Sequence, residues 1–282
     1  MFFNKYRLED ITDKIGDGIH GTPEYDDNGD FYFVNGNNLV HGDIVFKNDT
    51  KRINEEQYLK NKRDLNKNTL LVSINGTLGN VAKYNNEKII LGKSACYINV
   101  KDEYNVDYVY FVFESPKFKK YLQYGANGTT IKNVPLSAIR NYEILIPSKE
   151  NQDKIVKILK SIEDKIKLNN KINNNLQELA KSIYYEKFKD KTKNGKLKDI
   201  LDLHKKSIKS KDESLKYFPI DVLPMNYLIT RDGKTNEEAQ SSLVEFKKYD
   251  ILVGAMRVYF HRVCLAAEDG ITRTTTFVLR PK

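Results

Sequence analysis

The chain has 282 residues, of which 40% are hydrophobic and 30% charged, so it is long enough for two domains and can bury real cores. This composition excludes an intrinsically disordered chain. The sequence has no secretory signal and no apolar run long enough to span a membrane. Cys96 and Cys264 lie too far apart in sequence to suggest a pair or a metal-ligand motif, which favours a reduced, cytoplasmic protein.

The formal net charge of +9 permits a polyanionic partner such as nucleic acid, but its distribution is more informative than its size. The segment 148–198 contains 14 lysines, no arginine and seven acids, a net charge of +7. The rest of the chain therefore carries only +2. Any reading of bases outside that segment must depend on the local arrangement of side chains.

Residues 1–147 have the pattern of a mixed α/β domain with several short strands. Runs of β-branched and aromatic residues between Gly, Asn and Asp turns predict strands at Phe31–Val34, Thr69–Ile74, Lys88–Leu91 and Ala95–Val100. The stretch Val106–Tyr124 is expected to be helical, and Ser115-Pro116 inside it predicts the start of a second helix.

A long helix is predicted from Ser148 to about Phe188, because this stretch lacks both Pro and Gly. Pro147 ends the preceding strand, Ser148 can cap the helix, and the acid Glu150 suits its first turn. About 40 helical residues span roughly 60 Å, more than a small domain needs for its own core.

This helix carries a heptad seam. The seam positions are Ile155, Ile158, Ile162, Asn169, Ile172, Leu176, Leu179 and Ile183. Such a stripe must pack against another helix, in the manner of a coiled coil; an ordinary amphipathic core helix is the alternative. An Asn at position 169 is typical of seams in which register matters more than stability.

The third block, from about Gly195, repeats the opening of the first. Residues 195–200 echo residues 6–11, and residues 249–254 echo residues 68–73. The second copy is incomplete, because its sequence ends soon after the second echo, so the chain is a natural truncation or a fragment. Two reading domains joined by a helical spacer would suit an elongated, bipartite ligand.

Six short motifs follow one another along the first two thirds of the chain. They are Asp17–Pro23, Phe33–Leu39, Gly76–Val81, Gly128–Val134, Ile144–Pro147 and Gln152–Leu159. Together they resemble the specificity subunits of type I restriction-modification systems. The likeness is good over about residues 5–190 and loose over residues 195–282.

The resemblance implies an α+β protein with three parts. Residues 1–147 would form a first target recognition domain, residues 148–194 a coiled-coil-type spacer and dimerisation region, and residues 195–282 a partial second target recognition domain. Such a chain would bind double-stranded DNA at a half-site of a bipartite target. It would perform no catalysis and hold no cofactor.

The resemblance also implies partners. Methylation subunits and restriction or motor subunits would dock on the chain, and S-adenosylmethionine, ATP and Mg²⁺ would act on those partners. The second helical region of a complete subunit is missing from this sequence. The seam can therefore pair with a second copy of the chain, as a homodimer, or with a separate second half.

Candidate DNA-binding residues lie in loops that can reach phosphates and base edges. In order of preference they are Thr129, Thr130, Lys132 and Asn133, then Asn75, Thr77 and Lys93, and then His20, Thr22 and Tyr25. The alternative for the first loop is that it only caps a turn. Analogous candidates in the third block are Arg257, His261, Arg262 and Arg273.

Two other functions remain open. Asp221 followed by Glu245-Phe246-Lys247 formally resembles the carboxylate pattern of metal-dependent DNA endonucleases. The chain could also be a helical scaffold whose flanking domains bind protein. No metal site is expected, since the four histidines are scattered.

Overall fold

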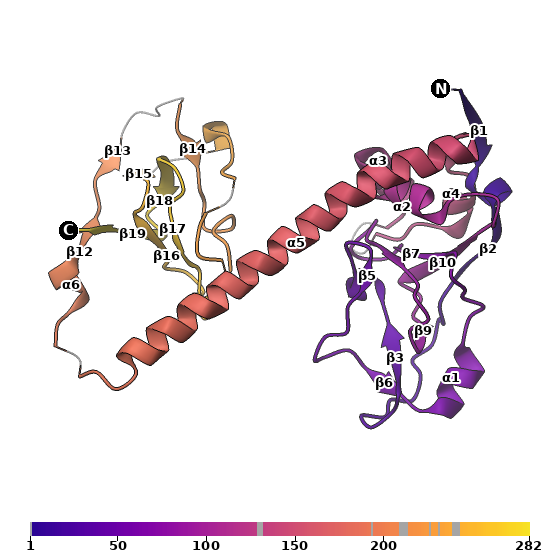
Figure 1. Cartoon of the computed structure of the whole chain (residues 1–282), viewed down its shortest axis with the longest axis horizontal. Helices are drawn as coiled ribbons and strands as arrows, with labels where there is room; N and C mark the ends of the chain where they lie inside the picture. The colour runs from indigo at the N-terminus through magenta and orange to yellow at the C-terminus, as the bar shows by residue number, and fades with distance from the viewer. Residues whose placement is uncertain are drawn as a thin grey trace. The chain divides into compact units, whose positions relative to one another are not determined.

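The structure is a computed structural model, and it describes residues 2–128, 132–192, 194–208, 214–225, 227–230, 232–238 and 243–282. The chain forms two compact units, Met1–Ile166 and Lys167–Lys282. Helix α5 (Lys149–Phe188), the long helix in Figure 1, contributes to both. The predicted mixed α/β architecture with one long helix is confirmed. The domain limits at residues 147 and 194 stay a prediction.

The main sheet of the first unit is antiparallel, with the strand order β2-β10-β7-β8. Its strands are β2 (Thr12–Asp17), β10 (Ala95–Val100), β7 (Thr69–Ser73) and β8 (Val81–Lys83). Every residue of β7 and β10 is buried, which explains why both strands are continuous runs of mainly apolar residues and do not alternate with polar ones.

A second sheet has the order β6-β3-β9, and its strands β3 and β9 run parallel. The strands are β6 (Arg52–Ile53), β3 (Phe31–Val34) and β9 (Ile89–Leu91), and helix α1 (Glu55–Asn61) follows β6. Two strand pairs accompany these sheets in the described part of the unit: β4 (Leu39–Val40) with β5 (Asp43–Ile44), and β1 (Phe3–Arg7) with β11 (Glu143–Pro147).

The two predicted helices separate where the sequence indicated. Helix α2 (Val106–Glu114) begins after Asn105, whose side-chain oxygen accepts hydrogen bonds from the amides of residues 107 and 108. Helix α3 (Pro116–Gly125) begins after Ser115, whose hydroxyl accepts from the amide of residue 118. A proline at the first helical position needs no hydrogen-bond partner for its nitrogen. The short helix α4 (Leu136–Arg140) leads into β11.

Gln152 fixes the start of α5 to the first unit. Its side chain is buried; Oε1 accepts from the Asn105 amide at 2.9 Å, and Nε2 donates to the Pro147 carbonyl at 3.0 Å. Farther along the helix, Glu163 accepts a hydrogen bond of 2.8 Å from the hydroxyl of Tyr110. Burial, and then this hydrogen bond, raise the pKa of Tyr110, so the hydroxyl stays a donor. The first turns of α5 are therefore part of the first unit's fold.

The second unit contains two four-stranded sheets. The first has the order β12-β19-β16-β17, from strands Leu201–His204, Thr276–Pro281, Ile251–Gly254 and Val263–Leu265. The second has the order β13-β15-β18-β14, from strands Ser207–Ile208, Leu243–Phe246, Gly270–Arg273 and Lys216–Tyr217. Short helical turns lie at Leu197–Ile200 (α6), Asn236–Glu238 and Val258–Phe260.

The first sheet of the second unit repeats the main sheet of the first unit. Strands β12, β19, β16 and β17 pair in the same antiparallel order as β2, β10, β7 and β8. Each sheet begins with a helical turn capped in the same way: Asp10 accepts from the Arg7 amide at 2.8 Å, and Asp199 accepts from the Lys196 amide at 2.7 Å. The short sequence echoes thus mark a repeat of the fold.

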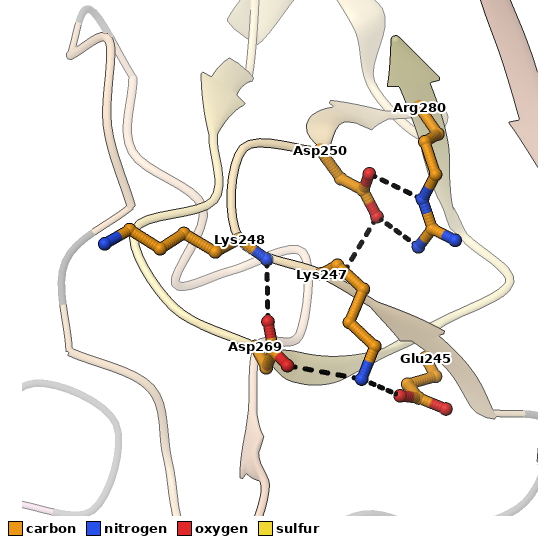
Figure 2. A network of polar contacts seen from close by, with 6 residues as sticks. All are labelled: Glu245, Lys247, Lys248, Asp250, Asp269 and Arg280. Carbon is orange, nitrogen blue, oxygen red and sulfur yellow. Dashed lines mark hydrogen bonds and ion pairs between the residues drawn. The ribbon is translucent and has the colours of Figure 1, made fainter. Parts of the chain in front are cut away.

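The two sheets differ in one pair of polar residues at the same register. Between β7 and β10, the Thr69 hydroxyl donates to Asn99 Oδ1 at 2.8 Å. In the second unit, Asp250 stands just before β16 and receives two hydrogen bonds from Arg280 of β19, at 2.9 and 2.7 Å (Figure 2). A neutral pair in one copy is therefore an ion pair in the other.

Among the helices that the structure describes, none combines the length and the apolar character that crossing a membrane requires.

Candidate nucleic-acid interface

The β7–β8 loop lies against a segment that is distant in sequence. Asn75 forms an isolated antiparallel bridge with Asn133, and the Gly76 amide donates to the Lys132 carbonyl at 3.0 Å. Asn133 in turn exchanges two backbone hydrogen bonds of 2.8 Å with Asn127. Gly76 has a φ of +73°, in the left-handed region that favours glycine. Two predicted DNA-binding loops are thus joined side by side.

The segment that carries His20 is held close to Lys93. Gly18 packs so tightly against the carbonyls of residues 91 and 92 that a Cβ there would lie 2.1 Å from the nearest oxygen. The amide of the next residue donates to the carbonyl of residue 91 at 2.7 Å. The His20 ring nitrogen Nε2 lies 2.7 Å from Asp17 Oδ2, and the His20 ring is mostly exposed. A glycine at position 18 therefore allows the close approach.

These elements enclose a cavity of about 330 Å³. Its polar lining consists of Asp17, His20, Asn75, Lys93 and Asn133, and its apolar floor includes Ile74 and residues 134–136. One ammonium, two side-chain amides and a His–Asp pair provide both donors and acceptors. Such a set can bind a phosphate through Lys93 and a base edge through either amide.

Four of the eight candidate residues that the structure describes line this cavity: His20, Asn75, Lys93 and Asn133. Lys132 and Thr77 are exposed in the adjoining loops. Thr22 is also exposed, and the ring of Tyr25 lies 6.1 Å from that of Phe33, with Lys51 nearby. Thr129 and Thr130, the first candidates from sequence, lie outside the described residues.

Asp17 was not selected from the sequence as a site residue. Its separation of three residues from His20 within the first motif was the available signal. Asp17 also borders a larger, open cavity of about 650 Å³. Basic and tyrosine side chains line much of this second cavity: Lys14, Lys62, Arg63, Tyr58, Tyr84 and Tyr97. Residues 60–63 include three basic side chains, and this cluster was the feature of the sequence that could have indicated the second cavity.

The helical seam is exposed along most of its length. Ile155 is the exception, since it packs partly against the core of the first unit. The six other aliphatic seam side chains are between 44% and 62% exposed: Ile158, Ile162, Ile172, Leu176, Leu179 and Ile183. Asn169 is exposed as well. An exposed aliphatic stripe of this length is unusual on the surface of a protein and is typical of an interaction surface.

The residues of the nuclease-like pattern are engaged in ion pairs. Glu245 lies 2.6 Å from Lys247 Nζ, which also lies 3.2 Å from Asp269 (Figure 2). Asp221 lies 3.3 Å from Lys234. Within the part of the chain that the structure describes, no three His, Cys, Asp or Glu side chains are grouped so as to hold a metal ion.

Comparisons with known proteins agree on one family. Residues 3–178 match the family model described as type I restriction modification DNA specificity domain. This match covers more than half of the chain, so the chain belongs to that family.

A relative from Methanocaldococcus jannaschii, the type I restriction enzyme MjaIX specificity subunit, is 26% identical over 188 residues. The match covers 65% of this chain and 43% of the relative, so it spans well under half of the relative's length. Among solved structures, the S subunit of a type I restriction-modification system from M. genitalium has a TM-score of 0.55 at 16% identity. It covers 100% of this chain and 73% of that one, and it shows a shared fold.

Proposed function

We propose that this chain is the non-catalytic, sequence-reading subunit of a type I restriction-modification complex. The observation that carries the proposal is the convergence of His20, Asn75, Lys93 and Asn133, from separate parts of the sequence, on one polar cavity of the first unit. Membership of the DNA specificity domain family supplies the class of ligand, double-stranded DNA. The first unit would read one half of a bipartite site.

The partners follow from the same proposal. Methylation subunits, and restriction or motor subunits, would bind this chain and supply the chemistry, with S-adenosylmethionine, ATP and Mg²⁺ on those subunits. The exposed seam of α5 would pack against a second helix, either in another copy of the chain or in a separate second half. DNA in the cytoplasm would be the natural substrate of such a complex.

Methylome sequencing tests the proposal most directly. A host that lacks other modification systems is given this gene with its methylation subunit, and methylated adenines or cytosines are mapped. We expect a split motif with two specified ends. A palindromic motif would mean two identical readers, and an asymmetric motif would mean two different ones.

Footprinting separates this proposal from the scaffold alternative. The chain, bound to its methylation subunit, should protect the motif and leave scrambled DNA unprotected. Absence of sequence-specific protection would overturn the DNA-reading function. Mg²⁺-dependent cleavage by the chain alone, abolished in Glu245→Ala, would instead establish the endonuclease alternative.

A further inference from the structure

The β16–β17 loop of the second unit, residues 255–262, corresponds to the β7–β8 loop of the first. Both loops are closed by the same backbone hydrogen bond at their base. The Gly254 amide donates to the Arg262 carbonyl at 2.9 Å, as the Ser73 amide donates to the Asn80 carbonyl at 2.9 Å. Since the flanking strands also pair alike, a candidate reading loop of the first unit has a counterpart in the second.

The counterpart loop has unusual residues at its two left-handed positions. In the first unit these positions are glycines, Gly76 with φ +73° and Gly79 with φ +80°. In the second unit they are Arg257 with φ +52° and His261 with φ +47°. A Cβ makes the left-handed conformation unfavourable, so two such residues in one loop are costly to folding. Strained side chains of this kind are concentrated at ligand-binding sites.

Apolar side chains of this loop are exposed. Tyr259 is 65% exposed, and Met256 and Val258 are exposed to a similar extent. The rings of Tyr259 and Phe260 lie 4.7 Å apart. Among the described residues of the second unit, the ring of Tyr259 is therefore largely uncovered.

Arg262 holds the base of the loop in place. Its Nη1 donates to the carbonyls of Asp221, at 3.2 Å, and Leu223. Its guanidinium carbon lies 5.6 Å from the centre of the Phe260 ring. A fixed base presents Tyr259 and Arg257 in a defined position, which lowers the entropy lost when the loop binds a ligand.

The composition of the loop favours nucleic acid as that ligand. Residues 255–262 include two arginines and a histidine but no acid, and they surround two aromatic rings. Aromatic side chains stack on bases, apolar residues wedge between base steps, and neighbouring cations neutralise phosphates. A protein partner would require only the apolar part of this set.

We infer that the β16–β17 loop is a DNA contact of the second unit, in which Tyr259 stacks on a base and Arg257 binds an adjacent phosphate. This inference rests on the proposed function. It also implies that the two units read DNA differently, because the first-unit loop presents the polar residues Asn75 and Thr77 at the same place and no aromatic ring. A single chain that reads DNA with both units would therefore recognise an asymmetric motif.

The test uses the full chain in complex with its methylation subunit and a duplex that carries the methylated motif. Tyr259→Ala should weaken binding of this duplex about tenfold, in the range expected for one base–aromatic stack. Phe277→Ala is the matched control, because Phe277 is an aromatic residue of the same unit, 47% exposed on strand β19. A fluorescent base analogue at the contacted position should respond to the wild type and to Phe277→Ala, but not to Tyr259→Ala.

A second variant, Arg257→Gly, has opposite effects on folding and on binding. Glycine relieves the left-handed strain, so Tm should rise, while the slope of log K against log salt should become shallower by about one.

Full DNA affinity in both Tyr259→Ala and Arg257→Gly would overturn the inference. The inference would also be overturned if either variant lost the methylation subunit but kept its affinity for DNA. The loop would then be a contact with that protein and not with DNA. If the wild type itself shows no sequence-specific binding, the proposed function fails together with this inference.

Discussion

Arg280 forms two hydrogen bonds with the buried carboxylate of Asp250, and this pair joins β19 to the start of β16. Hydrogen bonding with Asp250 raises the pKa of the Arg280 guanidinium, so the guanidinium stays charged. Since the Thr69–Asn99 pair of the first unit is neutral at the same register, the second unit alone depends on this charge pair.

Arg280→Met should therefore destabilise the second unit. Removing the guanidinium leaves a carboxylate that is almost fully buried without its partner, at a cost of about 3 kcal/mol. Urea unfolding followed by a probe in the second unit measures the loss. Lys282→Met is a control for the loss of one exposed positive charge near the same end of the chain, and it should change stability little. Equal stability of the two variants would contradict the role of the pair.

Gln152→Ala should loosen the connection between α5 and the first unit. The substitution leaves the Asn105 amide and the Pro147 carbonyl without the hydrogen bonds that the buried Gln152 side chain supplies, at a cost of about 2 kcal/mol. Hydrogen exchange of the amides in the first turns of α5 should accelerate. Gln123→Ala, an exposed position of α3, should leave both stability and exchange unchanged.

The sequence was sufficient to predict elements whose signals are local. Strands β3 and β10 have the predicted limits, and Ser115-Pro116 separates two helices as expected, because burial pattern and capping chemistry act over a few residues. The strand order of the second unit was not predicted beyond a short echo. Sheet order depends on pairing between distant segments, and the residues of such a pair, as Asp250 and Arg280 show, need not match between copies.

The candidate site also depends on contacts between segments that are distant in the sequence. His20, Asn75, Lys93 and Asn133 could be chosen singly, as polar residues in glycine-rich loops. Their grouping depends on the bridge between residues 75 and 133 and on the tight packing at Gly18, neither of which is visible in sequence spacing. The positive φ of Arg257 was equally unpredictable, because its residue type disfavours that conformation.

Lowering the pH should reduce the free energy of unfolding of the second unit, because Asp269 becomes protonated. The backbone amide of Lys248, followed by the Lys247 ammonium, holds the pKa of Asp269 below its ordinary value of 3.8. The unfolded chain therefore binds this proton more readily than the folded one. The stabilisation is complete above the unfolded pKa, about 4, and is lost as the pH falls through the lower folded pKa.

Asp269→Asn should reduce the loss of stability that occurs as the pH falls below neutral. The amide oxygen can still accept from Lys248, but it no longer titrates, so stability should fall less between neutral pH and acid than in the wild type. Tm measured across that range tests the expectation. Asp13→Asn, at an exposed position of β2, controls for the loss of one surface carboxylate. Parallel pH curves for wild type and Asp269→Asn would exclude the proposed linkage.

Lys93 and Asn75 should contribute differently to DNA binding if the first-unit cavity is the reading site. Lys93→Ala should weaken binding to all sequences and reduce the slope of log K against log salt by about 0.9, the value for one phosphate contact. Asn75→Ala should instead relax the preference at one base pair by about 1–3 kcal/mol. Competition binding with single-position variants of the motif separates the two effects. Lys120→Ala is the control for the loss of one exposed lysine of the first unit, because Lys120 lies on α3 outside the cavity.

The α5 seam should govern association of the chain. Pairing would remove six half-exposed aliphatic side chains from water, and each one that becomes fully buried contributes about 1.5–3 kcal/mol. A carboxylate in the middle of the seam would have to be buried unpaired, so Ile172→Asp should abolish association. Asn174→Asp adds the same charge on the other side of the helix, two residues further on, and should have no effect.

Sedimentation equilibrium of the full chain, alone and with its methylation subunit, distinguishes the possible occupants of the seam. Association of the chain alone that Ile172→Asp abolishes indicates a second copy. Association that occurs only when the methylation subunit is present, and that Ile172→Asp also abolishes, indicates that the seam packs against that subunit. Asn169→Leu should strengthen either association, because it replaces a polar seam residue by an apolar one, while permitting alternative registers. Unchanged masses in all three variants would mean that the seam does not pair, and the exposed stripe would then need another partner.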